Sequence, residues 1–375
     1  MSRVRVIRHG RYLGDFVEGE SYAHPWEVTV DDGMSALFAA SFQDATPVYA
    51  SRERARALGF RDRPLSPLLL LNLGVSFSVH DVSEQAIAHL AYLDVRFPEA
   101  VYAGDTLRAW STVIATKPTS DGARGVVHVR TVVANQHRAI ACVLGRKVLV
   151  PSGRLDERAP RGDAALAPVE TQERLPVELR GRVLAPLRGG GFSGCSWEDF
   201  DVGDVLVHDV GRTVGESEHM QLTTLVRNSH PLHLDEVYAR DGGSFAGTRV
   251  VYGGLVLSWV LSLASRDTTG SALWETGLDD GAHPSAVVAG DTLYAATKVL
   301  AKQEHGSEAG EITFRVVGVK NTPARALLEA GEDLFAPEHG KTSRKVEAKV
   351  VEITRRILVP RAQVTPATPS TRTPP

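Results

Sequence analysis

The sequence predicts an α+β fold in which two copies of one domain each wrap an antiparallel sheet around a central apolar helix. The first observation is an internal repeat: the pentapeptide Ala-Gly-Asp-Thr-Leu at residues 103–107 recurs 186 positions later, at residues 289–293. The second is a helical segment in each copy, at residues 67–80 and 254–266, that is apolar on nearly every side. The third is a series of strand-like runs after each segment. A buried helix followed by a sheet long enough to curl around it is an α+β arrangement.

The repeat extends beyond the pentapeptide. Residues 15–19 correspond to residues 199–203, and His24 corresponds to His208, both at an offset of 184. Matches in the same order with nearly constant offset indicate two diverged copies, which we expect to pair as a pseudo-dimer. The predicted organisation is an N-terminal domain at 1–151, a linker at 152–191, a C-terminal domain at 192–360 and a disordered tail at 361–375.

Each copy is predicted to begin with a short helix. Asp31 or Asp32 can cap this helix in the first copy, and its partner follows Glu216 in the second. The apolar helix comes next and must be enclosed by other structure, because it has no polar face. The predicted strands are residues 90–97, 106–116, 126–134 and 140–150 in the first copy, and 286–288, 292–302, 311–319 and 346–359 in the second.

Composition excludes several classes of protein. The 375 residues include 42 Lys and Arg against 45 Asp and Glu, so a formal net charge of −3 gives no electrostatic signature of binding to nucleic acid or to an acidic membrane surface. Hydrophobic residues make up 43% and charged residues 23%, as in ordinary globular proteins, which excludes wholesale disorder.

The cysteines and the apolar stretches indicate where the protein is found. Cys142 and Cys195 are too few for a disulfide framework, and no Cys/His spacing suggests a zinc site. The N-terminus lacks the apolar core of a signal peptide, and the longest apolar stretches, at 65–77 and 254–264, are shorter than the ~20 residues that span a bilayer. We therefore expect a soluble, cytoplasmic protein without a metal site.

The segment with the clearest chemical meaning is Arg-Asn-Ser-His-Pro-Leu-His-Leu-Asp at residues 227–235, followed later by Gly253 and Gly254 at the start of the second apolar helix. His233 titrates in the range that suits acid–base chemistry near neutral pH. Asn228 can hydrogen-bond a water molecule or the imidazole. The amide of Gly254, at a helix N-terminus, can hold a carbonyl oxygen whose negative charge grows during a reaction. This combination favours proton transfer next to a carbonyl.

Each of these residues also has a purely structural interpretation. His233 could be hydrogen-bonded for structure alone, Asn228 could cap a helix end, and the glycine pair could serve close packing. Glu218, on the preceding helix, could supply an acid, since the sequence does not fix its distance from Asn228.

Two motifs resemble a known family. The segment Asn-x-His-Pro-Leu-His-x-Asp at 228–235 and Tyr-Gly-Gly-Leu at 252–255 resemble the signature of MaoC-like (R)-specific enoyl-CoA hydratases, whose usual motif is Gly-Asp-x-Asn-Pro-Leu-His. Residues 214–221, 249–254 and 289–295 are similar to one branch with two fused domains, the mesaconyl-C1-CoA hydratases, also called β-methylmalyl-CoA dehydratases. The resemblance covers both copies and implies a double hotdog fold, with each sheet wrapped around its central helix.

The resemblance also implies a reaction. It indicates a hydro-lyase that reversibly hydrates an α,β-unsaturated acyl-CoA, with mesaconyl-C1-CoA giving β-methylmalyl-CoA. His233 would take a proton from a water held by Asn228, while the amide of Gly254 holds the enolate-like oxygen. No metal or redox cofactor is implied, because the thioester acidifies the α-position and coenzyme A is part of the substrate. The residues expected to contact the substrate are His230, Gly253, Tyr252 and Arg227.

The sequence departs from the general signature in both copies. Asn228 stands where the signature has Asp, and His230 where it has Asn, so His233 would carry the proton transfer nearly alone. The first copy keeps Asp44 but has Tyr49 at the histidine position, and its apolar helix opens with Ser-Pro in place of the glycine pair. We therefore predict that the first copy is a structural partner that shapes the acyl-CoA tunnel.

Other functions stay open at this point. A general (R)-specific enoyl-CoA hydratase would act on straight-chain substrates. An acyl-CoA thioesterase would need a carboxylate that directs water onto the carbonyl, and a non-catalytic acyl-CoA binder would need neither. Arg227, Arg240 and Arg249 are candidates for the coenzyme A phosphates or for ordinary surface charges. No nucleic-acid or membrane partner is expected, and the sequence does not decide whether pseudo-dimeric chains form a homo-oligomer.

Overall fold

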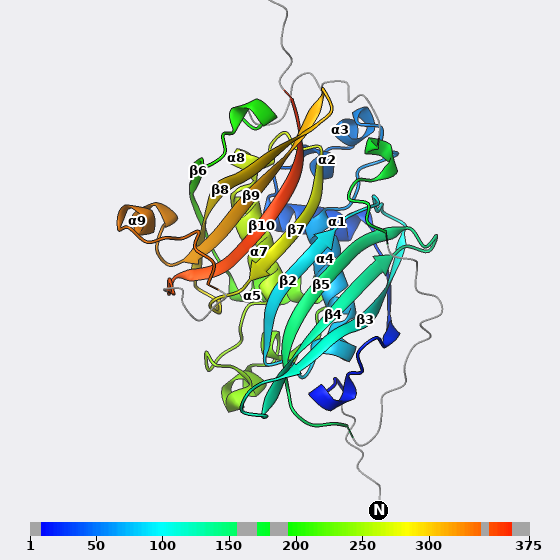
Figure 1. Ribbon diagram of the computed structural model, residues 1–375, viewed down its shortest axis with the longest axis vertical. Coiled ribbons are helices and arrows are strands. Elements are labelled where there is room, and N and C mark those ends of the chain that lie inside the picture. The colour runs from blue at the N-terminus through cyan, green and yellow to red at the C-terminus, as the bar shows by residue number, and fades with distance from the viewer. Residues whose placement is uncertain (1–8, 156–170, 181–193, 339–344, 362–375) are drawn as a thin grey trace, which may run out of the picture.

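The computed structural model describes residues 9–155, 171–180, 194–338 and 345–361. The predicted tail beyond residue 361 and most of the predicted linker lie outside the described residues. The described strands form one ten-stranded antiparallel sheet (Figure 1). In spatial order the strands are β1 (Ser21–Thr29), β3 (Thr106–Pro118), β4 (Arg124–Ala134), β5 (Ile140–Pro151), β2 (Ala88–Arg96), β7 (Trp274–Ala282), β10 (Lys349–Pro360), β9 (Ala309–Lys320), β8 (Thr292–His305) and β6 (Val205–Thr213).

The helices fall into the same two series as the strands. The α-helices are α1 (Asp32–Phe42), α2 (Pro47–Ala50), α3 (Arg52–Ala57), α4 (Pro67–Phe77), α5 (Glu216–Leu225), α6 (Glu236–Tyr238), α7 (Gly253–Leu263), α8 (Ser265–Thr268) and α9 (Ala324–Glu329). Short 3-10 or π turns lie at Leu13–Asp15, Val79–Ser83, Val177–Leu179, Trp197–Asp199, Pro231–His233 and Ala239–Gly243. As predicted, Asp31 caps α1, since its Oδ1 accepts the Met34 N–H at 2.7 Å.

The two copies join at the centre of the sheet, where β2 pairs antiparallel with β7. Tyr92 lies opposite Gly281, and Val95 lies opposite Leu278. Five strands lie on each side of this junction, β1, β3, β4, β5 and β2 on one side and their counterparts on the other. The predicted pairing of two copies as a pseudo-dimer is therefore confirmed, and it takes the form of a shared sheet.

The apolar helices α4 and α7 lie side by side behind the centre of the sheet (Figure 1). Every residue of α4 is buried, as the absence of a polar face predicts. Asn72 is the polar residue that α4 places against α7, and its Nδ2 donates to Ser258 Oγ at 2.9 Å. Ser258 is the counterpart of Asn72 at the repeat offset of 186. The two copies therefore contact each other through equivalent positions of their central helices.

The recurring histidine of the repeat is part of the fold. His24 lies 2.9 Å from Asp81 through Nδ1, and His208 lies 2.6 Å from Asp267 through the same atom. All four side chains belong to equivalent positions of the two copies, and the second ring nitrogen of each histidine lies within hydrogen-bond distance of a hydroxyl group. Because both copies keep this arrangement, the repeat in the sequence is also a repeat in the structure.

One predicted strand is wrong and two strands were not predicted. Residues 286–288 form no strand, and the strand that follows α7 is instead β7, at Trp274–Ala282. The sequence of β7, Trp-Glu-Thr-Gly-Leu-Asp-Asp-Gly-Ala, lacks the pattern of a buried strand, because the strand places the charged Glu275 in the protein interior. That carboxylate is tolerated there because Arg355 forms an ion pair with it at 2.6 Å. The edge strands β1 and β6 were not predicted.

The described part of the predicted linker, residues 171–180, packs on the first copy. Arg174 forms an ion pair with Asp94 at 2.7 Å, and the Tyr102 hydroxyl donates to Glu178 at 3.0 Å. Leu179 is buried. This part of the chain is therefore held against the sheet, while the predicted domain boundaries stay a prediction.

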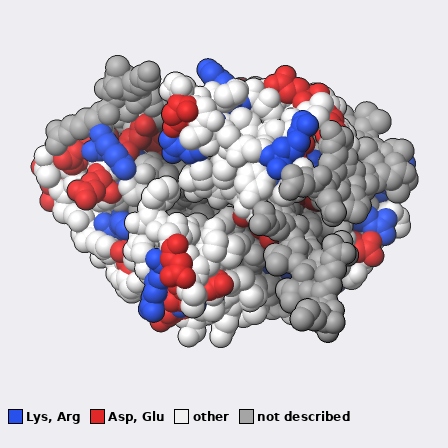
Figure 2. Space-filling view, turned by 90° about the horizontal axis from the view of Figure 1, so that it is seen from below, with Lys and Arg blue, Asp and Glu red and all other residues white. Residues whose placement is uncertain are grey.

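Charged side chains of both signs are interspersed on the face seen in Figure 2. Among the described residues visible in that view, neither sign gathers into an extended patch. This agrees with the near-neutral balance of charges in the sequence.

Candidate active site

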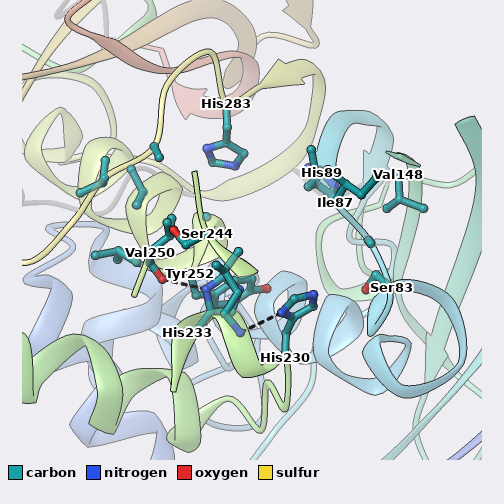
Figure 3. Close-up of a pocket in the computed structure, with 18 of the residues that line it drawn as sticks. Ser83, Ile87, His89, Val148, His230, His233, Ser244, Val250, Tyr252 and His283 are labelled. Carbon is teal, nitrogen blue, oxygen red and sulfur yellow. Dashed lines mark hydrogen bonds between the residues drawn. The ribbon is translucent and has the colours of Figure 1, made fainter. Parts of the chain in front are cut away.

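A central pocket of about 360 Å³ lies between the two copies. The first copy lines it with residues of α4, of the turn after α4, and of β2 and β5. The second copy lines it with the loop that carries the histidine motif, with residues 243–246 and 250–253, and with residues 283–287. Figure 3 shows His233 and Tyr252 on one side, Ser83, His89 and Val148 on the other, and His283 above them. Most of the lining is apolar, and the polar side chains converge from both copies.

The ring of His233 is held in one orientation by the backbone. Its Nδ1 lies 2.8 Å from the carbonyl oxygen of Val250. Because a carbonyl oxygen can only accept, Nδ1 carries the hydrogen, and the lone pair of the neutral ring is on Nε2. Burial, together with neighbouring His230, lowers the pKa of His233 to about 3. The imidazole is therefore neutral at physiological pH and can accept a proton at Nε2.

Asn228 combines the two roles that the sequence left open. Its Oδ1 accepts the backbone N–H of His230 at 3.0 Å, which caps the turn that carries the motif. Asn228 also lines the central pocket, and its Nδ2 can act as a hydrogen-bond donor. Tyr252 is adjacent: burial raises the pKa of its hydroxyl well above the usual value, and Asn228 beside it acts to lower that pKa.

His230 is tied to the backbone. Its Nδ1 accepts the N–H of Leu232 at 3.1 Å (Figure 3). Burial lowers its pKa to about 4, and a backbone hydrogen bond at Ala86 of the first copy acts in the opposite direction. His230 lines the pocket, and its bond at Ala86 connects the two copies.

The two glycines at the start of α7 occupy different surroundings. Gly253 lines the pocket, and a Cβ atom there would lie 2.9 Å from His283 Nε2. Gly254 does not line the pocket; a Cβ atom there would collide with Asn72 Oδ1 and would lie 2.6 Å from the ring of Tyr252. Leu255 and Val256 both donate their amides to the carbonyl oxygen of Tyr252, so the helix itself does not use the amides of either glycine. Close packing is thus the observed reason for Gly254, and Gly253 is the glycine at the cavity.

Several candidates of the sequence lie outside the pocket. Arg227 is exposed, with a left-handed φ of 58°, and lies at a separate crevice beside Trp26. Glu218 forms an ion pair with Arg212, and Asp44 accepts from the backbone of its neighbour Thr46. Arg249 and Arg240 both form ion pairs with Glu236. The structure thus does not bring these residues to His233.

The contribution of the first copy to the pocket was not predicted in detail. It includes His89, Tyr92 and Arg146, and the second copy adds His283. Burial lowers the pKa of His89 well below the usual range and that of His283 to about 4, so both rings are neutral. The repeat offset could have pointed to His89. Its counterpart 186 positions later is Glu275, so the two copies carry chemically different residues at this equivalent position.

The equivalent place on the other side of the pseudo-symmetry is filled with side chains. There Glu275 and Arg355 form their buried ion pair, and the hydroxyl of Tyr49 accepts the backbone N–H of Glu275 at 3.0 Å. Trp274 packs against Tyr49 with ring centroids 5.5 Å apart. Tyr49 stands where the second copy has His233, so the first copy lacks both the imidazole and the space.

Two absences concern the part of the chain that the structure describes. No group of three or more His, Cys, Asp or Glu side chains in that part of the chain is arranged to hold a metal ion. None of the helices described there is long and apolar enough to cross a membrane.

Together, the shared sheet, the enclosed helices and the histidine-lined pocket define a class, the MaoC-like double-hotdog proteins. The fold is similar to a solved structure from Chloroflexus aurantiacus, described as a putative MaoC domain protein dehydratase, with a TM-score of 0.77, 28% sequence identity and coverage of 94% of this chain and 98% of that one. A Mycobacterium tuberculosis protein described as having a double hotdog fold matches with a TM-score of 0.67 at 19% identity over 93% of this chain and 98% of its own.

Sequence comparison narrows the class to a family. Residues 1–326 match the family model described as mesaconyl-CoA hydratase, and the chain belongs to that family. A mesaconyl-CoA hydratase of Cereibacter sphaeroides is 35% identical over 338 residues, covering 88% of this chain and 94% of the relative. A β-methylmalyl-CoA dehydratase of Chloroflexus aurantiacus is 32% identical over 322 residues, covering 84% and 89%. The predicted resemblance is thereby confirmed.

Proposed function

We propose that this protein is a hydro-lyase that reversibly adds water to mesaconyl-C1-CoA and forms β-methylmalyl-CoA. The observation that carries the proposal is the hydrogen bond from His233 Nδ1 to the Val250 carbonyl, which leaves Nε2 as a proton acceptor in a pocket shared by both copies. Membership of the mesaconyl-CoA hydratase family supports the choice of an acyl-CoA substrate.

In the hydration direction, Asn228 Nδ2 holds a water molecule by donating to its oxygen. Nε2 of His233 takes one proton from this water, and the hydroxide adds to Cβ of the enoyl thioester. The electron pair of the double bond moves toward the thioester carbonyl, which becomes enolate-like. The imidazolium then returns the proton to Cα. One water is consumed, with its hydroxide on Cβ and its proton on Cα, and the base is regenerated.

The low pKa of His233 suits this sequence of steps. A neutral ring is ready to accept a proton, and the negative charge that develops on the enolate stabilises the imidazolium and raises its pKa during the reaction. The amides at the start of α7 are proposed to hold the enolate oxygen, as expected for Gly254 from the sequence. Gly253 lies closer to the cavity, and its amide is the second candidate for this role.

The residues that line the pocket distinguish the proposed hydratase from a thioesterase. A thioesterase would need a carboxylate to direct water onto the carbonyl carbon, but none of the described residues that line the pocket is Asp or Glu. We further propose that no cofactor takes part, since the thioester itself acidifies Cα. The soluble, cytoplasmic location remains part of the proposal, as does a homo-oligomer of pseudo-dimeric chains.

Product analysis tests this function. The purified protein is incubated with mesaconyl-C1-CoA and, separately, with crotonyl-CoA, while the loss of enoyl-thioester absorbance is followed and products are identified by mass. Addition of one water to the first substrate, with the thioester intact, supports the proposal. Addition to crotonyl-CoA alone would make the protein a general enoyl-CoA hydratase. Free thiol would indicate a thioesterase, and no reaction would indicate a binder.

A further inference from the structure

The central pocket contains a buried cation without an anionic partner. Arg146 is 1% exposed, and it is the sole Lys or Arg among the described residues that line the pocket. Its Nη2 donates to Ser78 Oγ at 2.6 Å, and its Nη1 donates to Ser83 Oγ at 3.3 Å. Its Nε is buried with no hydrogen-bond partner. Among the described residues no carboxylate lies within 4.0 Å of the guanidinium. A buried charge of this kind is costly unless it is paired.

The second copy shows what normally completes this position. Arg146 pairs with Tyr92 in the sheet, and Arg355 pairs with Leu278, the residue 186 positions after Tyr92. The two arginines therefore occupy equivalent places. Arg355 is satisfied by a bidentate ion pair with the carboxylate of Glu275, through Nε at 2.8 Å and Nη2 at 2.6 Å.

The first copy has a cavity where the second copy has this carboxylate. The counterpart of Glu275 is His89, whose neutral ring cannot balance a guanidinium. Both ring nitrogens of His89 are buried without a hydrogen-bond partner, so a second donor lies on the same side of the pocket. Burial lowers the pKa of Arg146 only to about 10, so its positive charge remains at neutral pH.

We propose that Arg146 binds the free carboxylate of the substrate and thereby selects acyl-CoA thioesters of dicarboxylic acids. This rests on the proposed function. The substrate carboxylate takes the place at Arg146 that Glu275 occupies at Arg355. In mesaconyl-C1-CoA this carboxylate is attached to Cβ, the carbon that receives hydroxide. Arg146 comes from β5 and His233 from the other copy, and both line the pocket, so the proposal places the reacting double bond between the cation and the base. Neutralising the carboxylate also reduces its repulsion of the incoming hydroxide.

A matched pair of substrates and a matched pair of variants test the proposal. Tiglyl-CoA has the carbon skeleton and geometry of mesaconyl-C1-CoA with a methyl group in place of the free carboxylate. For the wild type, we expect kcat/KM to favour mesaconyl-C1-CoA by at least ~100-fold, because tiglyl-CoA leaves a buried cation unpaired. In Arg146→Met this preference is expected to fall to about one, through loss of activity on mesaconyl-C1-CoA and unchanged or raised activity on tiglyl-CoA.

Arg355→Met is the control for a structural role. It strands the Glu275 carboxylate and is expected to lower the Tm while keeping the substrate preference, whereas Arg146→Met strands no acid and keeps the Tm. The proposal is overturned if Arg146→Met keeps the preference, or if it lowers activity on both substrates equally and reduces the Tm as Arg355→Met does. Should Arg146→Met not fold, the wild-type preference decides, and equal rates on both substrates overturn the proposal. Hydration of neither compound by the wild type would instead refute the proposed function.

Discussion

The Nδ1 atom of His233 lies 2.8 Å from the carbonyl oxygen of Val250, and this contact assigns the two ring nitrogens different roles. The carbonyl fixes the hydrogen on Nδ1, so the basic lone pair of Nε2 belongs to the side of the ring not held by the backbone. Val250 lies just before the glycine pair, and so one short segment both orients the proposed base and leads into the helix whose first amides are proposed to hold the enolate oxygen.

The first prediction concerns the dependence of activity on pH. Because the pKa of His233 is lowered to about 3, the base stays unprotonated throughout the range from pH 5 to pH 8. We therefore expect kcat/KM for mesaconyl-C1-CoA to show no acidic limb near the ordinary histidine pKa of about 6.5. Binding of coenzyme A alone over the same range controls for titration of its phosphates. A loss of activity centred near pH 6.5 that binding does not explain would contradict this assignment.

The second prediction concerns stability. Burial holds the pKa values of His230, His233 and His283 at about 4 or below. Between these values and about 6.5, the unfolded chain binds protons that the folded chain does not, so stability is lost as the pH falls. Each ring contributes up to about 1.4 kcal/mol per pH unit in that window. Urea unfolding between pH 7 and pH 5 measures the slope, and His283→Leu is expected to flatten it. An unchanged slope in this variant would show that His283 is not neutral in the folded protein.

The third prediction separates the two glycines. Gly254→Ala places a Cβ atom against Asn72 and Tyr252 and is expected to reduce stability by about 1–3 kcal/mol, the usual effect of overpacking. Gly253→Ala meets only the tip of His283 and projects into the pocket, so stability is retained and kcat/KM falls. Urea unfolding and steady-state kinetics on both variants distinguish these effects. Equal loss of stability in both would contradict the different surroundings described for them.

The fourth prediction concerns Asn228. In Asn228→Asp the carboxylate still accepts the His230 N–H, so the turn is kept, but the donor Nδ2 is replaced by a negative oxygen. Hydration of mesaconyl-C1-CoA is expected to fall by about tenfold or more, which corresponds to one hydrogen bond of roughly 1.4 kcal/mol. Activity on crotonyl-CoA, which has no free carboxylate, is expected to rise relative to activity on mesaconyl-C1-CoA. The ratio of the two rates is the measurement, and an unchanged ratio would show that Asn228 does not influence substrate choice.

The sequence predicted the parts of the fold that have a periodic or repeated signal. The buried helices α4 and α7 were evident from their lack of a polar face, and the shared offset placed most strands correctly. It failed at β7, because a buried Glu275 makes sense only once Arg355 is known to lie beside it. Such a partner, 80 residues away, is brought in by tertiary structure and leaves no local trace.

The residues of the site also fall into those that the sequence predicted and those that it did not. His233, Asn228, His230, Gly253 and Tyr252 belong to continuous motifs, and the structure places all five at the pocket. The first-copy residues of the pocket follow no local motif. They reach it only because β2 pairs with β7 at the centre of the sheet.

The measurement that tests the account most directly is the turnover of His233→Asn with mesaconyl-C1-CoA. Asparagine can keep a donor toward the Val250 carbonyl while removing Nε2, so the fold is preserved and the base is lost. We predict that kcat falls by at least ~10², the lower end of the usual contribution of general acid–base catalysis, with an unchanged Tm. A variant that hydrates mesaconyl-C1-CoA at nearly the wild-type rate would contradict the claim that His233 is the base.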